Sequence, residues 1–275
     1  MVKKKKSNMK IEEANNYFTL ITGGSMGIGR AIAYECAGRN MNLLLVSLPE
    51  PELEATAEEI RRKFGISVHT FGIDLTEKDA PEKVYNWCKE NHYQVNILVN
   101  NAGRAGTAIF EDSTFEYNDI RIQLNIRALV CLTYLFLKDL KTPDRSYILN
   151  IGSFSAFFSI PYKSVYCATK AFVYRFSRAL NAELKHTPVS VTVVCPNGVK
   201  TNPDTYKRIN THGFLSRLII LSAEEVARIA INGMLKNKIV VIPGFFNKIL
   251  LTISKIIPPG IAERRTAKIF TKELI

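Results

Sequence analysis

The sequence lacks the residue patterns of several protein classes. Its five cysteines are odd in number, lie far apart and never show C-x-x-C spacing, which argues against a disulfide framework and against a zinc site. The histidines are equally scattered, so we expect no metal centre. The longest uncharged stretch, residues 146–162, contains Gly152, Pro161 and four serines. Such a stretch is a poor membrane-spanning helix.

A secretory signal is also missing from the expected place. The lysines near the start are followed by the mostly polar residues 11–16 instead of an apolar segment. Together with the unpaired cysteines, this predicts a cytoplasmic protein, either throughout or held peripherally at a membrane.

The formal net charge of +12 lies almost entirely at the two ends. Residues 1–10 hold five lysines, residues 236–275 hold eight basic and two acidic side chains, and residues 11–235 hold 24 basic against 23 acidic ones. A near-neutral body argues against a nucleic-acid groove. The basic ends suit an anionic surface, or simply solubility.

The chain is 47% hydrophobic and 23% charged, which excludes a disordered protein. Short apolar runs rich in β-branched residues alternate with helical patterns, and this alternation predicts parallel strands with helices on both faces. The expected strands are residues 17–22, 42–46, 67–71, 96–100, 147–151, 189–194 and 239–242. The prediction is an α/β, Rossmann-type doubly wound parallel sheet of about seven strands in one domain.

We expect that domain to cover residues 11–243, with residues 1–10 disordered. Residues 244–275 form a basic, amphipathic extension with a break at Pro258. Residues 197–221 are too long for an ordinary connection between elements, which is typical of a lid or binding loop.

A glycine-rich turn follows the first strand, with Gly23, Gly27 and Gly29 spaced G-x-x-x-G-x-G before a helical pattern. Glycines allow backbone N–H groups to approach a pyrophosphate, and the start of the helix directs its positive end to the same charge. The turn therefore predicts a dinucleotide site. The second strand ends at Ser47 without an acidic residue, which favours NADP(H) over NAD(H).

Ser153 follows the fifth strand, and Tyr166 and Lys170 lie four residues apart in a helical pattern. They share one helix face, so the ammonium can lie beside the phenol and favour its ionised form. A tyrosine with a lowered pKa can exchange a proton with an alcohol near neutral pH. Asn125 lies on an apolar helix, where a buried amide needs partners; the alternative is an exposed position.

With these motifs in order along the chain, the sequence resembles the short-chain dehydrogenase/reductase family over about residues 17–243. The resemblance implies that Tyr166 is the general acid in reduction and Ser153 orients the carbonyl. It implies that Lys170 holds the nicotinamide ribose and lowers the tyrosine pKa, and that Asn125 anchors a proton-relay water.

The resemblance also implies a set of cofactor contacts, in the glycine turn, at Asp74 and Leu75, in Asn100–Gly103, in the catalytic helix and in Pro196–Thr201. The predicted residues are Gly23, Ser25, Met26, Gly27, Ile28, Ser47, Asp74, Leu75, Asn101, Ala102, Gly103, Tyr166, Lys170, Pro196, Val199 and Thr201. Asp74 and Asn101 could instead be simple turn residues.

Aromatic and aliphatic side chains surround the catalytic serine and recur in the long loop. They lie in residues 154–162 and at Phe214, Leu215, Leu218, Ile219, Ile220 and Leu221. If both segments line the pocket, the substrate is an apolar ketone or secondary alcohol. The apolar, basic tail is similar to that of the family branch with 3-oxoacyl-CoA reductases and hydroxysteroid dehydrogenases, which supports the same expectation.

The resemblance implies a homodimer or homotetramer built on the helices that contain Asn125 and Tyr166. Two non-enzymatic functions stay open, a dinucleotide-binding redox sensor and a membrane-surface scaffold that uses the tail. The intact Ser153, Tyr166 and Lys170 favour the enzyme, because a sensor has no chemical need for them.

Overall fold

The computed structural model describes residues 17–200, 219–254 and 256–274. The lysine-rich start of the chain lies outside the described residues. So do Thr201, Phe214, Leu215 and Leu218 in the predicted loop.

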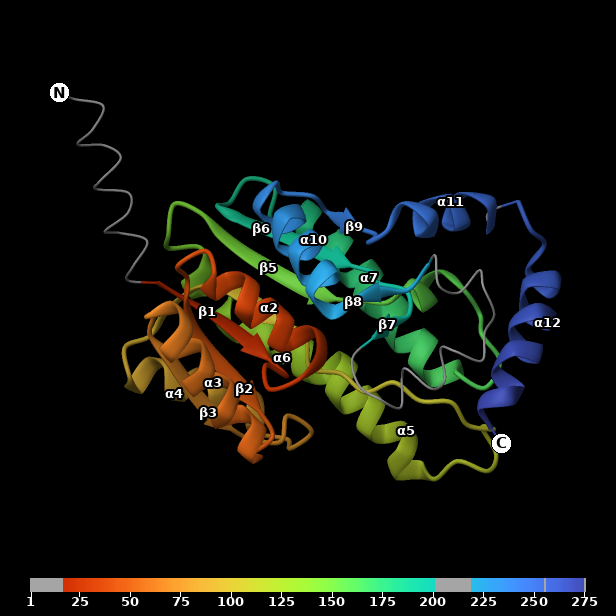
Figure 1. Cartoon of the computed structure of the whole chain (residues 1–275), viewed down its shortest axis with the longest axis horizontal. Coiled ribbons are helices and arrows are strands. Elements are labelled where there is room, and N and C mark those ends of the chain that lie inside the picture. The colour runs from red at the N-terminus through yellow and green to blue at the C-terminus, as the bar shows by residue number, and fades with distance from the viewer. Residues whose placement is uncertain (1–16, 201–218, 255, 275) are drawn as a thin grey trace.

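Seven parallel strands form the central sheet, in the order β3-β2-β1-β4-β5-β6-β9 (Figure 1). They are β1 (Tyr17–Thr22), β2 (Asn42–Ser47), β3 (Val68–Gly72), β4 (Gln94–Asn100), β5 (Ser146–Ile151), β6 (Val189–Val194) and β9 (Val240–Val241). Strand order reverses between β1 and β4, so the crevice at their carboxyl ends is the expected ligand position in such a sheet. The doubly wound fold predicted from the alternating pattern is confirmed.

Helices cover both faces of the sheet. On one face α2 (Gly27–Ala37), α3 (Pro51–Phe64) and α10 (Ala223–Leu235) bury their apolar sides against the strands. On the other face lie α4 (Ala80–Glu90), α6 (Leu129–Leu140) and α7 (Ser164–Glu183). A separate short pair, β7 (Val199–Lys200) with β8 (Leu221–Ser222), lies where the chain enters and leaves the predicted loop.

Local sequence explains where several helices begin and end. Pro51 occupies the first turn of α3, and Gly65 ends that helix with a φ of 66°, a left-handed conformation that glycine adopts at little cost. The side chain of Ser222 accepts from the backbone N–H of Glu225, whose carboxylate accepts from the N–H of Ser222, so α10 starts with the predicted capping box.

One continuous helical segment, Phe115–Leu140, is long and apolar enough to cross a bilayer by length and composition. It consists of α5 (Phe115–Ile122), a π-helical segment η1 (Gln123–Ala128) and α6. Leu132, Phe136 and Leu140 on α6 are buried in the core beneath the sheet. This burial accounts for the apolar residues on one face of α6, and 39% of the segment's apolar 18-residue stretch is buried in all.

Two helices follow the last strand and project beyond the sheet (Figure 1). Helix α11 (Phe245–Ser254) leads to α12 (Pro259–Phe270), and a short 3-10 turn, η3 (Thr271–Glu273), follows. Asn247 fixes the start of α11, because its amide donates to the carbonyls of Ile219 and Pro243 and accepts from Asn197. The extension is thereby joined to both borders of the predicted loop.

Candidate functional site

The glycine turn lies between β1 and α2, at the carboxyl end of the central strand. Gly23 and Gly27 have φ values of 65° and 55°. A Cβ at Gly29 would overlap the carbonyl oxygen of Gly23, and a Cβ at Gly23 would lie 2.9 Å from the Asn101 amide. The turn therefore needs glycine at these positions for two different reasons, backbone conformation and close approach.

The amino end of α2 is free to bind an anion. Its N-cap residue, Met26, is extended and exposed and makes no side-chain cap hydrogen bond, and the first turn contains no acidic residue. Within the described part of the chain, neither the N-cap side chain nor an acidic side chain of the first turn therefore competes for its backbone N–H groups and the positive end of its dipole. This arrangement fits the pyrophosphate of a dinucleotide.

Thr22 and Asn101 lock the turn to the end of β4. The Thr22 hydroxyl accepts from the backbone N–H groups of Asn101 and Ala102, both at 3.0 Å, and donates to Val99. The Asn101 amide donates to the carbonyls of Thr22 and Gly23 at 2.8 and 3.1 Å. Thr22 was not among the predicted contacts, although its place directly before the first glycine was a usable signal.

Two hydroxyls meet at the end of β2. Ser25 and Ser47 lie 2.8 Å apart, and Thr56 donates to the Ser25 carbonyl at 3.2 Å. No acidic residue occurs in residues 42–49. The end of β2, which faces the adenosine ribose in such folds, therefore carries hydroxyl groups and no carboxylate in residues 42–49.

Asp74 and Leu75 follow β3 on the same side of the sheet. One Asp74 oxygen accepts from the backbone N–H and the hydroxyl of Thr76, at 2.9 and 2.8 Å, so the turn alternative is realised. Leu75 is buried in the core. Only the backbone and the second Asp74 oxygen remain for a cofactor contact.

Asn125 lies in the π-helical segment η1 and is 1% exposed. Its oxygen accepts from the Arg104 backbone N–H at 2.8 Å. Its amide donates to the Arg104 carbonyl and to the Thr169 hydroxyl, at 3.2 and 3.0 Å. The exposed alternative is wrong, and the irregular turn joins the loop after β4 to α7, which is a common use of π segments near functional sites. Thr169 escaped sequence analysis, because a threonine on a helix carries no signal of its own.

Ser153 and Tyr166 come together from β5 and α7. Burial raises the pKa of Tyr166 above its usual value of 10.0, and hydrogen bonds with the hydroxyls of Ser153 and Ser155 oppose that rise. Ser153 also accepts from the backbone N–H and the hydroxyl of Ser155. The phenol thus lies in a small group of hydroxyls that can pass a proton or polarise a carbonyl oxygen.

Lys170 differs from the prediction. Its ammonium donates to the Ile151 carbonyl at 2.8 Å, and it is not among the causes that set the pKa of Tyr166. Lys170 is buried, and burial lowers its pKa from 10.5 to about 8. The physical reason is that a buried ammonium needs a hydrogen-bond acceptor, and the end of β5 offers one. A Cβ at Gly103 would lie 3.4 Å from the ammonium, so the predicted Gly103 leaves the lysine room.

The remaining predicted contacts lie after β6. Pro196 is buried, and its carbonyl accepts from the Phe154 N–H at 2.7 Å, which ties this segment to the serine segment. Val199 is buried in β7. Thr201 lies outside the described residues. Ile28 is half-buried at the start of α2, beside the glycine turn.

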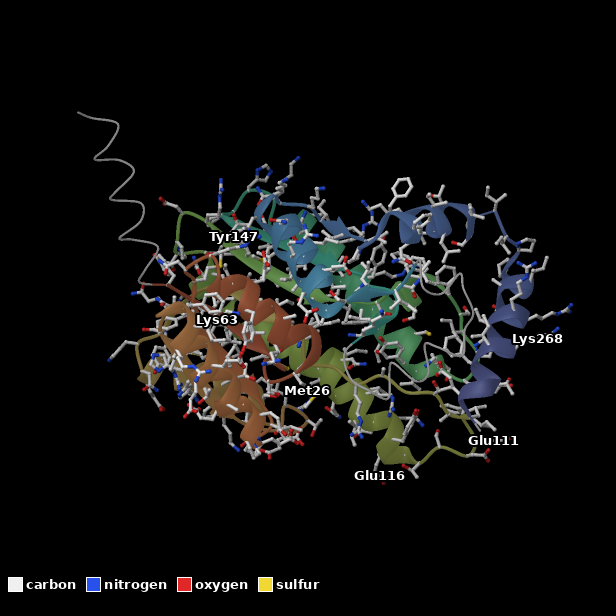
Figure 2. All side chains as sticks on the ribbon, viewed as in Figure 1. Met26, Lys63, Glu111, Glu116, Tyr147 and Lys268 are labelled. Atoms are coloured by element: carbon white, nitrogen blue, oxygen red, sulfur yellow. The ribbon has the colours of Figure 1, made fainter. Side chains whose placement is uncertain are left out.

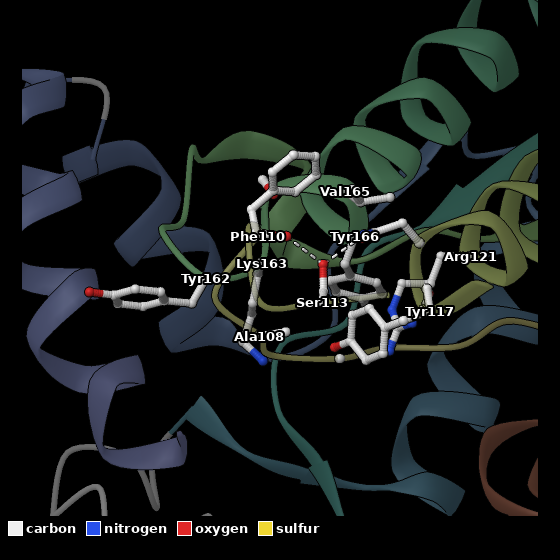
Figure 3. A pocket seen from close by; sticks show the side chains of 12 residues that line it. Ala108, Phe110, Ser113, Tyr117, Arg121, Tyr162, Lys163, Val165 and Tyr166 are labelled. Atoms are coloured by element: carbon white, nitrogen blue, oxygen red, sulfur yellow. Dashed lines mark hydrogen bonds between the residues drawn. The ribbon is translucent and has the colours of Figure 1, made fainter. Parts of the chain in front are cut away.

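A small cavity of about 10 Å³ opens beside Tyr166 (Figure 3). Among its lining residues are Arg121, Tyr117 and Lys163. The Arg121 guanidinium lies over the Tyr117 ring, 3.4 Å from its centroid, and donates to the Ala105 carbonyl at 2.8 Å. Sequence analysis had no signal for these residues, because only the fold brings the loop after β4 against the start of α7.

A second cavity of about 560 Å³ lies on the outer side of the serine segment and α7. It is mostly apolar, and Ser164 lines both cavities. Its lining residues are Ala156, Phe157, Phe158, Ser159, Ile160, Pro161, Ser164, Cys167, Ala168, Ala171 and Glu263.

Known proteins are similar to this chain in sequence and in fold. Residues 18–211 match the family model for short chain dehydrogenase. Human 17-beta-hydroxysteroid dehydrogenase type 3 is 36% identical over 78% of this chain and 67% of its own length. Bovine very-long-chain 3-oxoacyl-CoA reductase is 34% identical over 70% of this chain, and the match spans 62% of that enzyme.

A solved short-chain dehydrogenase from Sphingobium yanoikuyae in complex with NADPH has a TM-score of 0.74. It is 29% identical and covers 88% of this chain and 96% of its own. A short-chain dehydrogenase from Burkholderia phymatum in complex with NAD, at 20% identity and a TM-score of 0.77, shares the fold. With a family model that matches most of the described sheet, this chain belongs to the short-chain dehydrogenase/reductase family, whose members are NAD(P)-dependent oxidoreductases.

Proposed function

We propose that this protein transfers a hydride between NADP(H) and a lipophilic ketone or secondary alcohol. The observation that carries the proposal is the meeting of Ser153 with Tyr166 at the carboxyl end of β5. Asn125 bonds to Thr169 on the helix of Tyr166, and Lys170 bonds to the Ile151 carbonyl at the end of β5. The glycine turn lies at the end of β1. Acid-base groups and a pyrophosphate cradle thus face the same edge of one sheet.

The bound nicotinamide supplies or accepts the hydride. Tyr166 donates a proton to the carbonyl oxygen in reduction and accepts it in oxidation. Ser153 hydrogen-bonds the same oxygen, where negative charge develops. Asn125 holds the loop after β4 through Arg104 and holds α7 through Thr169, and in the family it anchors the relay water.

Lys170 binds the nicotinamide ribose in this proposal. With its pKa near 8 it still carries a charge at neutral pH, and burial makes that charge costly while the Ile151 carbonyl is its one acceptor among the described residues, so a further partner is favoured. A ribose hydroxyl beside the ammonium would supply that partner. The cofactor contacts on the glycine turn are Gly23, Ser25, Met26, Gly27 and Ile28.

NADP(H) is proposed over NAD(H) because Ser25 and Ser47 present two hydroxyls at the ribose corner without a carboxylate. A carboxylate there would favour the free ribose hydroxyls and repel a 2′-phosphate. Relatives of known structure hold either cofactor. The rise in melting temperature with NADPH and with NADH at equal concentration measures the preference directly.

The lipophilic substrate is supported by two observations. The cavity of about 560 Å³ has the size of a small-molecule pocket and mostly apolar walls. The two relatives described above are named for steroid and very-long-chain acyl substrates. A panel of steroid, 3-oxoacyl and small polar ketones tests this point, and turnover confined to the polar ketones would refute it.

The decisive test of the activity is Tyr166→Phe. We expect it to lower turnover of every ketone by about 10²–10⁴-fold, the usual worth of a positioned acid-base group, and to leave the NADPH-induced rise in melting temperature in place. Tyr174→Phe on the same helix is the matched control, because Tyr174 packs against Phe157 in the core. NADPH binding by a wild-type chain that reduces no ketone would favour the redox-sensor alternative.

A homodimer or homotetramer is proposed through the helices around the site. Phe115 on α5, Tyr134 on α6 and Phe172 on α7 expose 77%, 78% and 40% of their surfaces. Exposed aromatic side chains on adjacent helices are typical of interfaces. Analytical ultracentrifugation of the chain and of a Phe172→Glu variant tests this proposal, with dissociation expected for the variant.

The protein is proposed to be cytoplasmic and peripheral at a membrane. Helix α11 exposes Phe245, Phe246, Ile249 and Ile253, and the extension around it carries a surplus of basic residues. An apolar face with flanking positive charge binds anionic bilayers. Co-sedimentation with vesicles that contain phosphatidylserine should be lost on Phe245→Ser with Phe246→Ser, and unchanged binding would refute the membrane role of α11.

A further inference from the structure

The last residues of the described chain fold back onto the body beside the catalytic helix. Glu273 in η3 accepts from the Thr107 hydroxyl at 2.7 Å and pairs with the Lys163 ammonium at 3.2 Å. Lys163 also bonds to the Thr107 hydroxyl and lies 4.5 Å from the centre of the Phe270 ring. We name these four residues, Thr107, Lys163, Phe270 and Glu273, the C-terminal clasp.

The ion pair in the clasp is mostly buried, unlike an ion pair on the protein surface. The side chains of Lys163 and Glu273 are only 13% and 10% exposed. Exposed pairs are weakened by water and salt, whereas a buried pair leaves an uncompensated charge when one partner is removed. The residues are 110 and 166 positions apart, so the clasp holds the chain end in place against large segments of the fold.

Both body residues of the clasp border the candidate site. Lys163 lies three positions before Tyr166 and lines the small cavity together with it (Figure 3). Thr107 belongs to the loop after β4, and the backbone N–H of its neighbour Ala108 donates to the Tyr162 carbonyl at 2.9 Å. The tail therefore fastens to the two segments that flank the catalytic tyrosine.

Helix α12 connects this clasp to α11 and passes the larger cavity. Glu263 on α12 forms one wall, and Phe157, Phe158 and Ile160 on the serine segment form part of the other. Cys167 and Ala168, directly after Tyr166, complete the lining on α7. Ser164 lines both cavities, so the larger one adjoins the small cavity that Tyr166 lines.

We propose that α12, held by the C-terminal clasp, is the outer wall of the pocket for the apolar part of the substrate, with Glu273 as its positioning residue. The proposal rests on the proposed function and adds an element that selects substrates by size. Long apolar substrates contact the wall and need it in place. Small ketones react without reaching it.

Glu273→Gln in the full chain tests this selection. The amide keeps the size of the side chain and removes the charge that pairs with Lys163. We expect KM for a long-chain 3-oxoacyl or steroid ketone to rise by roughly an order of magnitude, about the worth of one buried charge-assisted contact, with kcat nearly constant. The kcat and KM values for a small ketone should stay within about twofold of the wild-type values, because a small ketone does not reach α12.

Lys268→Gln is the matched control. It also removes one charge from α12, but Lys268 is exposed (Figure 2), so both substrates should behave as in the wild type. Glu273→Asp should recover part of the long-substrate binding. Equal changes for long and small ketones, or no change for either, would overturn the proposal.

A readout without turnover separates this proposal from the proposed function. Cys167 lines the larger cavity and is 5% exposed, whereas Cys131 is already half-exposed and serves as the internal reference. With a maleimide at fixed pH and mass spectrometry, Glu273→Gln should label Cys167 several-fold faster relative to Cys131 than the wild type or Lys268→Gln does. Equal labelling of Cys167 in Glu273→Gln and the wild type would refute the proposal that α12 is a wall of the pocket. Absence of ketone turnover by the wild type would refute only the proposed function and leave the labelling result to decide.

Discussion

The two halves of the candidate site are formed by different groups, one mainly by backbone and the other mainly by side chains. The cofactor half, at the ends of β1 and β4, consists of backbone: positive-φ glycines, a helix start without a side-chain cap, and carbonyls held by Thr22 and Asn101. The substrate half consists of side chains brought from distant parts of the sequence, with Glu273 against Lys163 and Thr107. An atom added to the glycine turn collides with the backbone, so we expect one substitution there to abolish cofactor binding. A substitution among the side chains removes one contact at a time, so we expect each to reduce function only in part.

The largest effect should come from Gly29→Ala in the cofactor half. The new methyl group would overlap the Gly23 carbonyl, so the turn must shift and the pyrophosphate cradle is lost. We expect NADPH affinity to fall by more than about 100-fold, over 2.7 kcal/mol, measured by titration calorimetry. Gly38→Ala at the end of the same helix, where the nearest atom lies 3.4 Å away, should bind NADPH normally. Normal binding by Gly29→Ala would remove the distinction between the two halves.

Lys170→Met should produce the next largest change, and it should increase stability. Burial lowers the pKa of Lys170 from 10.5 to about 8, which corresponds to about 3 kcal/mol, and the unpaired Ile151 carbonyl returns about 1 kcal/mol of that. At pH 7 the free energy of unfolding without cofactor should therefore rise by about 2 kcal/mol, while activity is lost. Urea unfolding of both proteins measures the difference.

The sign of the pH dependence is a separate check on Lys170. Between pH 8 and 10.5 the unfolded lysine binds a proton that the folded one has released, so wild-type stability gains with rising pH relative to the variant. The advantage of Lys170→Met should shrink over this window and reverse to a small disadvantage above it, because only the lost Ile151 hydrogen bond remains. A constant advantage across pH would contradict the cause assigned to it.

Ser153→Ala should change the free energy of unfolding less than Lys170→Met does. It should clearly change the pH profile of kcat/KM. The hydrogen bond from Ser153 lowers the pKa of Tyr166, so its removal raises that pKa further. Oxidation needs the phenolate, and its kcat/KM profile should move to higher pH by up to about one unit. Reduction near neutral pH uses the protonated phenol and should lose rate without a shift of its profile there. An unchanged oxidation profile would argue against the contact.

Phe270→Leu in the clasp should have the smallest effect. It removes the aromatic face beside the Lys163 ammonium and keeps the apolar volume. We expect a loss of about 0.5–1 kcal/mol in the free energy of unfolding, with NADPH binding unchanged. A loss of NADPH affinity as large as that expected for Gly29→Ala would show that the two halves respond alike.

Sequence patterns predicted most of the fold because each pattern was local. Alternation of strands and helices predicted the doubly wound sheet, and Pro51, Gly65 and Ser222 indicated helix ends that the structure contains. For the candidate site, the glycine turn and the serine, tyrosine and lysine were predicted from their spacing together with their order along the chain. Thr22, Thr169 and the clasp were missed, because their contacts join residues 44 to 166 positions apart.

The sequence by itself determined the family and the doubly wound sheet, and it predicted the residues of the catalytic group. The tertiary structure alone decided that Lys170 bonds to the Ile151 carbonyl, because a buried ammonium takes the acceptor that the fold places within reach. It also decided that the short turn η3, which follows α12, pairs with Lys163 just before the catalytic helix. Composition predicts an amphipathic tail, but only packing selects which of its segments covers a cavity.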